Sequence, residues 1–351
     1  MQHYDCIIIG GGQSALACAY YLRRTNLKYV LLDANNEPGG AWLKAWDSLT
    51  LFSPAEHSSL PGWQMPKSEE EFPTRNEVIE YLTQYEKRYK IPVKREVVVK
   101  SIVKADETDF IVKTNQKDFT AKRIIAATGT YKAPFIPKVM GLTDFKGVSI
   151  HSAAYRNATP FKNQSVLIVG EGNSGAQILA EVSKVATTFW ATRKEPEFLP
   201  DDVDGRVLFD SASAIYYAKQ KGEKLDTATI NLGNIVMVPP VKKARERGVL
   251  LRTGALKSFT ENQIVWENGQ TTKIDAVIWC TGFHYNTEYL KQLVSLDDKG
   301  KTHTDGTRST DEPKLWLVGF GGWSGFASAT LIGVGRSARK TVKEVEDSLK
   351  S

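Results

Sequence analysis

Gly10-Gly-Gly12-Gln-Ser-Ala15 and Gly170-Glu-Gly172-Asn-Ser-Gly175 are the two stretches that decide the fold of this chain. Each directly follows a run of β-forming residues, Cys6-Ile-Ile-Ile9 and Val166-Leu-Ile-Val169. At such a strand-to-helix turn the first glycine adopts a conformation that a side chain forbids, and the second lets the backbone approach a pyrophosphate. The small third residue lets the helix pack closely, so that its free N–H groups face the phosphates. Two such turns predict two dinucleotide-binding units.

The residue that ends the next strand distinguishes the two units. After the first turn, Tyr29-Val-Leu-Leu32 is expected to form a strand that ends on Asp33, where an acid binds the ribose hydroxyls of an adenine dinucleotide. After the second turn, the strand expected at Thr188-Phe-Trp-Ala-Thr192 ends on Arg193 and Lys194. Cations at this place suit a 2′-phosphate, so the second site is predicted to prefer NADPH to NADH. The alternative is that these two cations form a solvated pair on a loop.

The composition is that of a globular protein, with 41% hydrophobic and 25% charged residues. The formal charge is +6, but the basic residues are scattered, and the densest run, Lys242-Lys-Ala-Arg-Glu-Arg247, is interrupted by an acid. This pattern predicts no nucleic-acid partner. No apolar stretch reaches the length of a membrane span and no apolar leader precedes Asp5, so we expect a cytoplasmic protein with no membrane partner.

The cysteines bear on the kind of redox chemistry. Cys6, Cys18 and Cys280 stand singly in apolar segments, and the sequence has no Cys-x-x-Cys. Flavin disulfide reductases share the plan of two dinucleotide units, but they need a redox-active cysteine pair beside the flavin. The spacing therefore disfavours that class. No cluster of histidines and cysteines predicts a metal site.

Strands and helices alternate along the chain, which predicts a doubly wound α/β fold with two Rossmann-like domains. The second unit interrupts the first, because a last strand, Leu315-Trp-Leu-Val318, and a helix at about 328–339 are expected to return to it. We predict a discontinuous FAD-binding domain at 1–158 and 278–351, with an inserted NAD(P)H-binding domain at 159–277. The role of a long insert within that domain, residues 195–248, stays open.

A longer motif lies between the two glycine-rich turns. Phe145-Lys-Gly147-Val-Ser-Ile-His151-Ser-Ala-Ala-Tyr155-Arg156 fits F-x-G-x-x-x-H-x-x-x-[YF] followed by a base. In this position the motif resembles the fingerprint of the class B flavoprotein monooxygenases, and specifically of the small bacterial flavin-containing monooxygenases. Baeyer–Villiger enzymes end the motif on Trp, where this chain has Tyr155. The resemblance covers essentially the whole chain and includes Gly39-Gly-Ala-Trp42, Ala127-Thr-Gly129 and Cys280-Thr-Gly282.

The resemblance implies FAD on the first unit and a nicotinamide cofactor on the second. NADPH would deliver hydride to FAD, and the reduced flavin would capture O₂ as a C4a-hydroperoxide. A soft nucleophile, a sulfide sulfur or an amine nitrogen, would then attack the distal oxygen in a sulfoxidation or N-oxidation. No nucleophile from the protein is required. His151 is expected to position the hinge rather than to act as an acid or base.

The candidate cofactor residues follow from the motifs and the resemblance. For FAD they are Gly10, Gly12, Gln13, Ser14, Ala15, Asp33, Gly40, Ala41, Trp42, Thr128 and Gly129. For NADPH they are Gly170, Gly172, Asn173, Ser174, Gly175, Gln177, Arg193, Lys194, Thr281 and Gly282.

One segment departs from the family pattern. Many members carry Thr-Asn-x-Pro after the FAD unit, with the Asn amide near the flavin C4a position, whereas this chain has Leu51-Phe52-Ser53-Pro54. Phe52 cannot donate that hydrogen bond. We expect Phe52 to line the pocket beside the flavin, and release of hydrogen peroxide to be higher as a result.

Three other functions stay open at this point. The first is Baeyer–Villiger oxidation of ketones, and the second is an NAD(P)H oxidase or reductase that inserts no oxygen. The third, a flavin-binding module without turnover, is disfavoured by the second nucleotide site. The natural substrate, the acceptance of NADH and a homodimeric state are not determined by the sequence.

Overall fold

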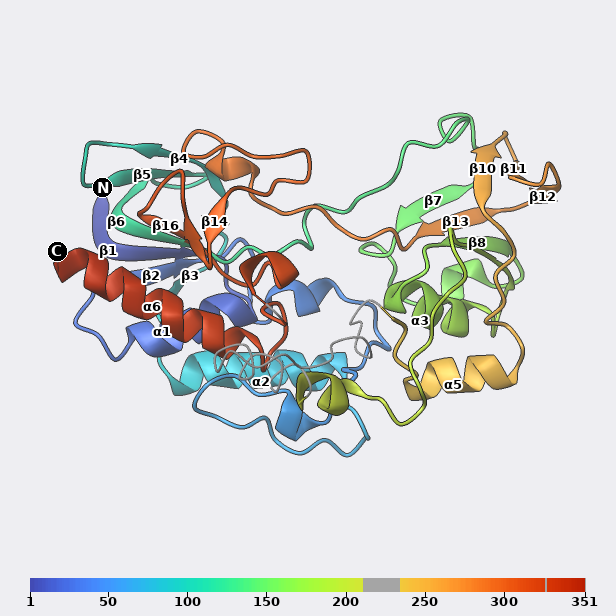
Figure 1. Ribbon diagram of the computed structural model, residues 1–351, viewed down its shortest axis with the longest axis horizontal. Coiled ribbons are helices and arrows are strands. Elements are labelled where there is room, and N and C mark those ends of the chain that lie inside the picture. The colour runs from blue at the N-terminus through green and yellow to red at the C-terminus, as the bar shows by residue number, and fades with distance from the viewer. Residues whose placement is uncertain (211–233, 326, 351) are drawn as a thin grey trace, which may run out of the picture. The chain divides into compact units, whose positions relative to one another are not determined.

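The computed structural model describes residues 1–210, 234–325 and 327–350 (Figure 1). The chain divides into two compact units. Unit 1 comprises Met1–Leu43, Pro54–Ala133 and His284–Ser351, and unit 2 comprises Lys44–Ser53 and Pro134–Phe283. Each unit is built on a parallel sheet, which confirms the predicted α/β class with two Rossmann-like domains.

Unit 1 contains a five-strand parallel core in the order β16-β6-β1-β2-β3. These strands are β1 (Gln2–Ile9), β2 (Tyr29–Leu32), β3 (Val93–Lys94), β6 (Phe119–Ala126) and β16 (Leu315–Leu317). Antiparallel strands extend or branch from the core, namely β4 (Val99–Lys104), β5 (Phe110–Thr114), β14 (Thr304–Asp305) and β15 (Arg308–Ser309). The central strand is buried on both faces, since Ile7 and Ile8 are both fully buried. This explains its continuous apolar run.

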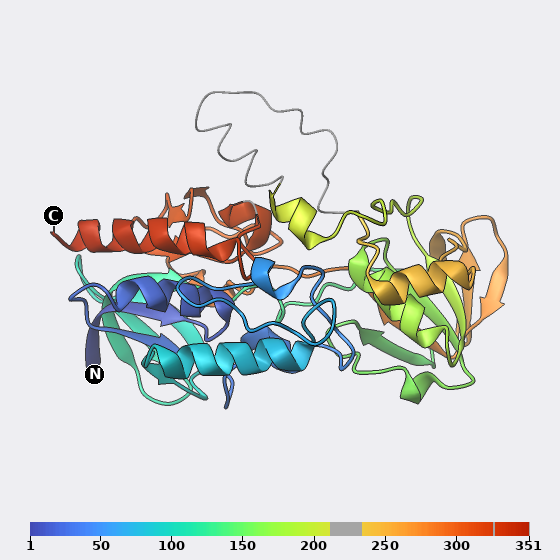
Figure 2. The same ribbon diagram turned by 90° about the horizontal axis from the view of Figure 1, so that it is seen from below.

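Three helices lie along one face of the unit 1 sheet, as both ribbon views show (Figures 1 and 2). They are α1 (Gln13–Leu22), α2 (Arg75–Arg88) and α6 (Val334–Lys350). Helix α2 begins with a capping box, in which the Thr74 hydroxyl accepts from the N–H of Glu77 and the Glu77 carboxylate accepts from the N–H of Thr74.

Unit 2 contains a four-strand parallel sheet in the order β7-β13-β8-β9. The strands are β7 (Val148–His151), β8 (Ser165–Val169), β9 (Thr187–Ala191) and β13 (Ala276–Trp279), and the helices are α3 (Asn173–Val182) and α5 (Pro239–Glu246). A small antiparallel sheet consists of β10 (Leu256–Phe259), β11 (Gln263–Trp266) and β12 (Thr271–Lys273). It packs on β13 through Phe259 and Trp279, whose ring centroids are 5.8 Å apart.

The compact units have other boundaries than the predicted domains. Strand β7 belongs to the fingerprint motif and pairs with β13 of unit 2. The main part of unit 2 therefore begins at Pro134, whereas the second domain was predicted to begin at residue 159. Unit 2 also extends to Phe283 and takes up Lys44–Ser53. The assignment of FAD and NAD(P)H to particular ranges stays a prediction.

The last helix was predicted, but with the wrong bounds. It was expected at 328–339, but α6 spans Val334–Lys350. The chain just before it forms turns, in which Ala327 has a φ of 55° and its carbonyl accepts from the N–H of Thr330. Of the insert at 195–248, residues 211–233 lie outside the described residues.

Short 3₁₀ helices complete the secondary structure: η1 (Gly40–Lys44), η2 (Ala55–His57), η3 (Thr159–Phe161), η4 (Glu288–Leu290) and η5 (Gly321–Ser324). Among the helices that the structure describes, none is long and apolar enough to cross a membrane.

Candidate functional site

The first glycine turn is built around a close backbone contact. Gly10 has a φ of 120°, and a Cβ at this position would lie 2.5 Å from the carbonyl oxygen of Ala127 at the end of β6. Two positions later, the nearest atom to a Cβ on Gly12 would be the Cα of Gly40, at 3.7 Å. Gly10 is therefore required by the packing of the strands, whereas Gly12 leaves open space at the turn.

That open space adjoins the start of α1. Within the described residues no side chain caps this helix end, and its first turn contains no acidic residue. Its unpaired N–H groups and positive dipole end suit an anion. Ala15 is fully buried, which lets α1 pack closely, and Ser14 is largely buried. The turn therefore fits the pyrophosphate of the predicted FAD.

Asp33, the predicted ribose ligand, lies in a buried ionic network. It directly follows β2, and only 3% of it is exposed. One carboxylate oxygen accepts from the N–H of Asn35 at 3.1 Å, and the other pairs with Arg95, whose second nitrogen pairs with Glu86. Burial raises the pKa of Glu86 despite this partner. Arg95 therefore fixes the orientation of Asp33 from the neighbouring strand.

Sequence reasoning missed Arg95 because it missed the two-residue strand β3. Leu32 pairs with Lys94 in the parallel register, so Asp33 and Arg95 are the next residues on two adjacent strands. The carboxyl ends of parallel strands meet at one edge of a sheet. A correct prediction of β3 would have been the signal that these two residues meet.

The other predicted FAD residues also lie in unit 1. The Trp42 indole N–H donates to the Gln13 side-chain oxygen at 2.9 Å, and the Thr128 hydroxyl donates to the carbonyl of Asn286 at 2.7 Å. Gly40 approaches Gly12, and Gly129 has no neighbouring atom within 4 Å of a Cβ. Ala41 is exposed, at the second position of η1.

The second glycine turn repeats the geometry of the first. Gly170 has a φ of 129°, and its Cβ would lie 2.3 Å from the carbonyl oxygen of Cys280 at the end of β13. A Cβ on Gly172 would meet no atom within 4 Å, whereas one on Gly175 would lie 2.3 Å from the carbonyl oxygen of Gly170. Within the described residues, α3 likewise starts with no side-chain cap and no acid in its first turn. This turn also fits a pyrophosphate.

The first residue of α3 has a further partner. The Asn173 side chain accepts from the N–H of Val236 at 2.8 Å and donates to the carbonyl of Asn234 at 3.2 Å. Its amide therefore ties the turn to the chain after the insert. Ser174 and Gln177 are partly exposed on the first two turns of the same helix.

The two predicted cations follow β9 as expected from the sequence. Arg193 has a side chain that is 93% exposed, and Lys194 pairs with Glu197 at 3.1 Å. A third cation, which sequence reasoning missed, stands beside them: the Arg252 guanidinium donates to the Thr192 hydroxyl at 3.1 Å. The end of β9 is thus the most basic part of the second site.

His151 is held by two hydrogen bonds within unit 2. Its Nε2 donates to the carbonyl of Gly282 at 2.9 Å, and its Nδ1 accepts from the N–H of Ala153 at 3.1 Å. Burial lowers the pKa of His151, which favours the neutral ring that this pattern requires. The predicted residues Thr281 and Gly282 lie in the same loop, and the Thr281 hydroxyl donates to the carbonyl of Phe135. Both ring nitrogens of His151 therefore have partners, and a positioning role for this residue stays a prediction.

Residues 44–53 join unit 2, although the chain on either side of them belongs to unit 1. The end of the fingerprint motif holds them. The N–H of Asp47 donates to the carbonyl of Arg156 at 2.8 Å, and the Asn157 amide donates to the Asp47 carboxylate at 3.1 Å. The Ser48 hydroxyl donates to Glu181 on α3 at 2.6 Å. The fingerprint thereby fixes this segment to the unit that carries the second glycine turn.

Phe52 lies in this segment and so belongs to unit 2, whereas the predicted FAD residues belong to unit 1. Its carbonyl accepts from the N–H of Gly205 at 2.6 Å, and its ring centroid is 5.8 Å from that of Phe209. A Cβ on Gly205 would approach the Phe52 ring within 2.7 Å. The backbone and the ring of Phe52 are therefore both anchored to the start of the insert.

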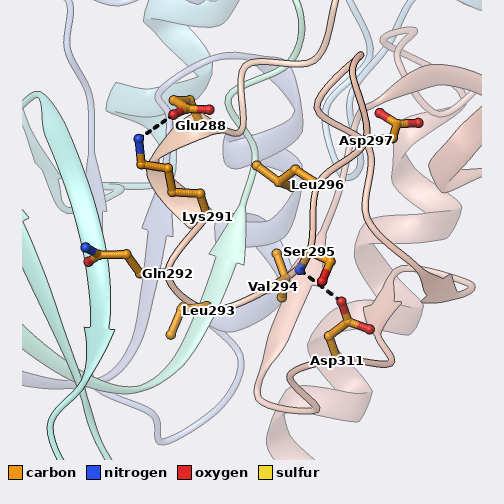
Figure 3. Close-up of a pocket in the computed structure, with 9 residues that line it drawn as sticks. All are labelled: Glu288, Lys291, Gln292, Leu293, Val294, Ser295, Leu296, Asp297 and Asp311. Atoms are coloured by element: carbon orange, nitrogen blue, oxygen red, sulfur yellow. Dashed lines mark hydrogen bonds and ion pairs between the residues drawn. The ribbon is translucent and has the colours of Figure 1, made fainter.

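A surface depression in unit 1 lies between η4 and the loop that follows it (Figure 3). Its lining is largely polar and includes an ion pair between Glu288 and Lys291 at 2.6 Å and a hydrogen bond from the N–H of Ser295 to Asp311 at 3.1 Å. None of the predicted site residues lines it. In the part of the chain that the structure describes, no group of three His, Cys, Asp or Glu side chains is placed to hold a metal ion.

Comparison with known proteins gives consistent results. The sequence profile of the pyridine nucleotide-disulphide oxidoreductase family matches residues 7–223. The structure of a flavin-containing monooxygenase from Stenotrophomonas maltophilia superposes with a TM-score of 0.91 at 45% identity, over 99% of this chain and 100% of that one. An oxidoreductase of Bacillus subtilis (strain 168) named CzcO is 30% identical over 97% of this chain and 99% of its own length. The bacillithiol disulfide reductase of Staphylococcus aureus shares the fold at 19% identity, with a TM-score of 0.71 over 98% of this chain and 99% of that one.

The geometry of the first turn predicts a clean separation between cofactor binding and folding. We expect Gly12→Val to give a colourless protein that still folds, because the substituted side chain occupies the open space that the pyrophosphate needs. Gly10→Ala is the control, and it should destabilise the protein because its Cβ meets the Ala127 carbonyl. The measurements are the flavin-to-protein absorbance ratio and thermal unfolding. Full retention of FAD by Gly12→Val would contradict the assignment.

The buried network predicts a role for Arg95 in both stability and FAD binding. Arg95→Met leaves the buried Asp33 carboxylate and the partly buried Glu86 carboxylate without their partner, which should lower the free energy of unfolding by about 3 kcal/mol. FAD affinity should fall as well, because Asp33 loses its fixed orientation. Glu86→Gln keeps the pair between Arg95 and Asp33, so it should bind FAD as the parent does. Unchanged FAD affinity in Arg95→Met would show that Arg95 does not position Asp33.

Proposed function

Because the chain belongs to the pyridine nucleotide-disulphide oxidoreductase family, as a flavin-containing monooxygenase, we propose that it oxygenates soft nucleophiles at the expense of NADPH. An enzyme of this kind works with FAD, a pyridine nucleotide, O₂ and a small-molecule substrate. The proposed substrates are sulfides and amines, which would leave as sulfoxides and N-oxides. NADPH is the proposed electron donor, with NADH as a poorer one.

The repeated geometry of the two glycine turns is the observation that carries this proposal. In each turn the first glycine contacts the end of a neighbouring strand, the second leaves open space, and the next helix starts without a side-chain cap. An enzyme that binds one dinucleotide needs one such turn. Two turns support an enzyme that passes electrons from one nucleotide to another.

The residues of the chain would divide the work between the units. Gly12 and the start of α1 would hold the pyrophosphate of FAD, while Asp33 would accept its ribose hydroxyls. Gly172 and the start of α3 would hold the pyrophosphate of NADPH. When bound, FAD supplies the chemistry that accepts hydride and activates O₂. The protein supplies orientation and keeps water from the reacting atoms, for which Trp42 is the proposed aromatic side chain of unit 1.

The cysteines argue against disulfide reduction, which the family name also covers. Cys6, Cys18 and Cys280 are free in the described chain. Burial raises the pKa of the Cys280 thiol to about 12, and it also raises the pKa of Cys6 and Cys18. A thiol that stays protonated is a poor nucleophile for disulfide exchange. Oxygen insertion therefore fits these residues better than thiol chemistry.

Two alternatives remain within flavin chemistry. Baeyer–Villiger oxidation of ketones is disfavoured by Tyr155, which stands where the fingerprint of those enzymes has Trp. An NAD(P)H oxidase that releases only hydrogen peroxide is favoured by Phe52, because its side chain cannot donate the hydrogen bond that an Asn amide donates at this position in many family members. We further propose that the enzyme acts in the cytoplasm. Gel filtration of the purified protein tests whether it forms a homodimer.

Product analysis tests the proposed function. Purified holoenzyme is supplied with NADPH, O₂ and methyl phenyl sulfide, and sulfoxide and hydrogen peroxide are counted per NADPH consumed. Sulfoxide that depends on both NADPH and O₂ supports the proposal. Peroxide alone, with sulfides, amines and ketones all unchanged, would favour the oxidase instead, and an ester from a ketone with no sulfoxide would favour Baeyer–Villiger oxidation.

The exposed cation after β9 predicts cofactor preference. A charge-assisted hydrogen bond contributes about 1.5–3 kcal/mol, so Arg193→Ala should lower kcat/KM for NADPH roughly 10- to 100-fold and leave NADH nearly unchanged. Lys273→Ala, an exposed cation on β12, is the matched control and should leave both values unchanged. Equal losses with both cofactors in Arg193→Ala would show that Arg193 does not contact the 2′-phosphate.

The anchored ring of Phe52 predicts how efficiently electrons reach the substrate. Phe52→Asn introduces an amide donor, so we expect less peroxide and more sulfoxide per NADPH than in the parent. The ring also packs on Phe209, and Phe52→Leu controls for that loss because it keeps an apolar side chain without a donor. Phe52→Leu should couple no better than the parent. Identical coupling in both variants would place Phe52 away from the reacting atoms.

A further inference from the structure

The second glycine turn contains a carboxylate, which is an unusual group beside a phosphate site. Glu171 stands between Gly170 and Gly172, the two glycines that form the turn. Its side chain is 23% exposed, so it is held against the protein rather than extended into solvent. A carboxylate here repels a phosphate, and for that reason its position needs a physical account.

Glu171 contacts the residue that the sequence assigns to the 2′-phosphate. One carboxylate oxygen accepts from the backbone N–H of Arg193 at 3.3 Å, and the other lies 3.7 Å from the Arg193 guanidinium. The Arg193 side chain is otherwise 93% exposed. The neighbouring cations have partners outside the turn, since Lys194 pairs with Glu197 and Arg252 with Thr192. Arg193 is therefore the cation that the turn itself partly neutralises.

The two charges favour different nucleotides. A carboxylate accepts a hydrogen bond from a ribose 2′-hydroxyl, and acidic residues at the ends of strands do this in NAD sites. A 2′-phosphate carries close to two negative charges, so it attracts a guanidinium and is repelled by a carboxylate. Glu171 and Arg193 thus act in opposite directions at one position of the cofactor.

We propose that Glu171 determines nicotinamide cofactor specificity in two ways. It accepts a hydrogen bond from the 2′-hydroxyl of NADH, and it competes with the 2′-phosphate of NADPH for Arg193. The inference rests on the proposed function, because it requires that a nicotinamide cofactor binds at the second turn. It deepens that function: the carboxylate limits the preference for NADPH and keeps NADH in use as the poorer donor. Glu171 is a specificity-determining residue, not a group that reacts.

A purely structural role for Glu171 has a different signature. If Glu171 only links the turn to the loop after β9 through the N–H of Arg193, an amide oxygen serves equally well. Glu171→Gln keeps that acceptor and removes the charge. A structural link therefore predicts no change in cofactor preference for this variant, whereas our proposal predicts one.

The test compares the parent with Glu171→Gln, Arg193→Ala and the double variant. Binding of NADP⁺ and NAD⁺ is measured by calorimetry, and flavin reduction by NADPH and NADH is followed without oxygen. Because the Arg193 side chain is 93% exposed to solvent, we expect Glu171→Gln to raise the preference for the phosphorylated cofactor roughly fivefold. NADP⁺ should bind more tightly and NAD⁺ more weakly. In the Arg193→Ala background the gain for NADP⁺ should shrink, because the competition for the guanidinium is gone.

The matched control is Glu267→Gln, which removes an exposed carboxylate between β11 and β12 and should leave the preference as in the parent. An unchanged ratio of the two dissociation constants in Glu171→Gln would overturn the inference, as would an equal shift in Glu267→Gln. Failure of the second turn to bind a nicotinamide cofactor looks different, because then neither nucleotide would bind to the parent or reduce its flavin, whereas absence of sulfoxide alone would contradict only the proposed oxygenation. That result would remove this inference as well.

Discussion

The close contact between a glycine and the end of a neighbouring strand is the constraint on which the rest of the structure depends. Gly10 lies against the carbonyl of Ala127, and Gly170 against the carbonyl of Cys280, in each case with a positive φ. This contact lets the chain turn from a central strand into a helix at the carboxyl edge of the sheet. The helix end and the open space beside the second glycine are direct consequences, and they make each turn suitable for a pyrophosphate.

The charged residues at the edges of the two sheets differ, although the two glycine turns have the same backbone geometry. In unit 1 the residue after β2 is Asp33, which is buried and held by Arg95. In unit 2 the residues after β9 are basic and exposed, and the acid comes instead from inside the turn, as Glu171. A buried and paired carboxylate is a fixed acceptor, whereas a carboxylate whose partner is an exposed guanidinium can lose that partner when a ligand arrives. The two carboxylates therefore differ in how firmly they are held.

The fingerprint motif has a structural role that its chemistry alone does not suggest. Strand β7 supplies an edge of the unit 2 sheet, and two hydrogen bonds hold the ring of His151, whose pKa is lowered by burial. The residues that follow hold Asp47 through a backbone bond and a side-chain bond. A segment that is close to unit 1 in sequence is thereby built into unit 2, together with Phe52. The motif thus holds two distant segments of unit 2 together.

The sequence by itself determined the α/β class, the two glycine turns and the placement of most strands. These depend on local properties, since glycine conformation, apolar runs and turn residues act within a few positions of the chain. It failed where an element was too short or too irregular to leave a pattern, as with β3 and the turns before α6.

Only the tertiary structure decided which distant side chains meet. The pairing of Arg95 with Asp33 follows from the register of two strands, and the contact of Glu171 with Arg193 follows from the parallel pairing of β8 with β9. The attachment of residues 44–53 to the fingerprint depends on bonds between segments about a hundred residues apart. Such contacts are set by the packing of whole elements, and no local pattern in a single sequence records them.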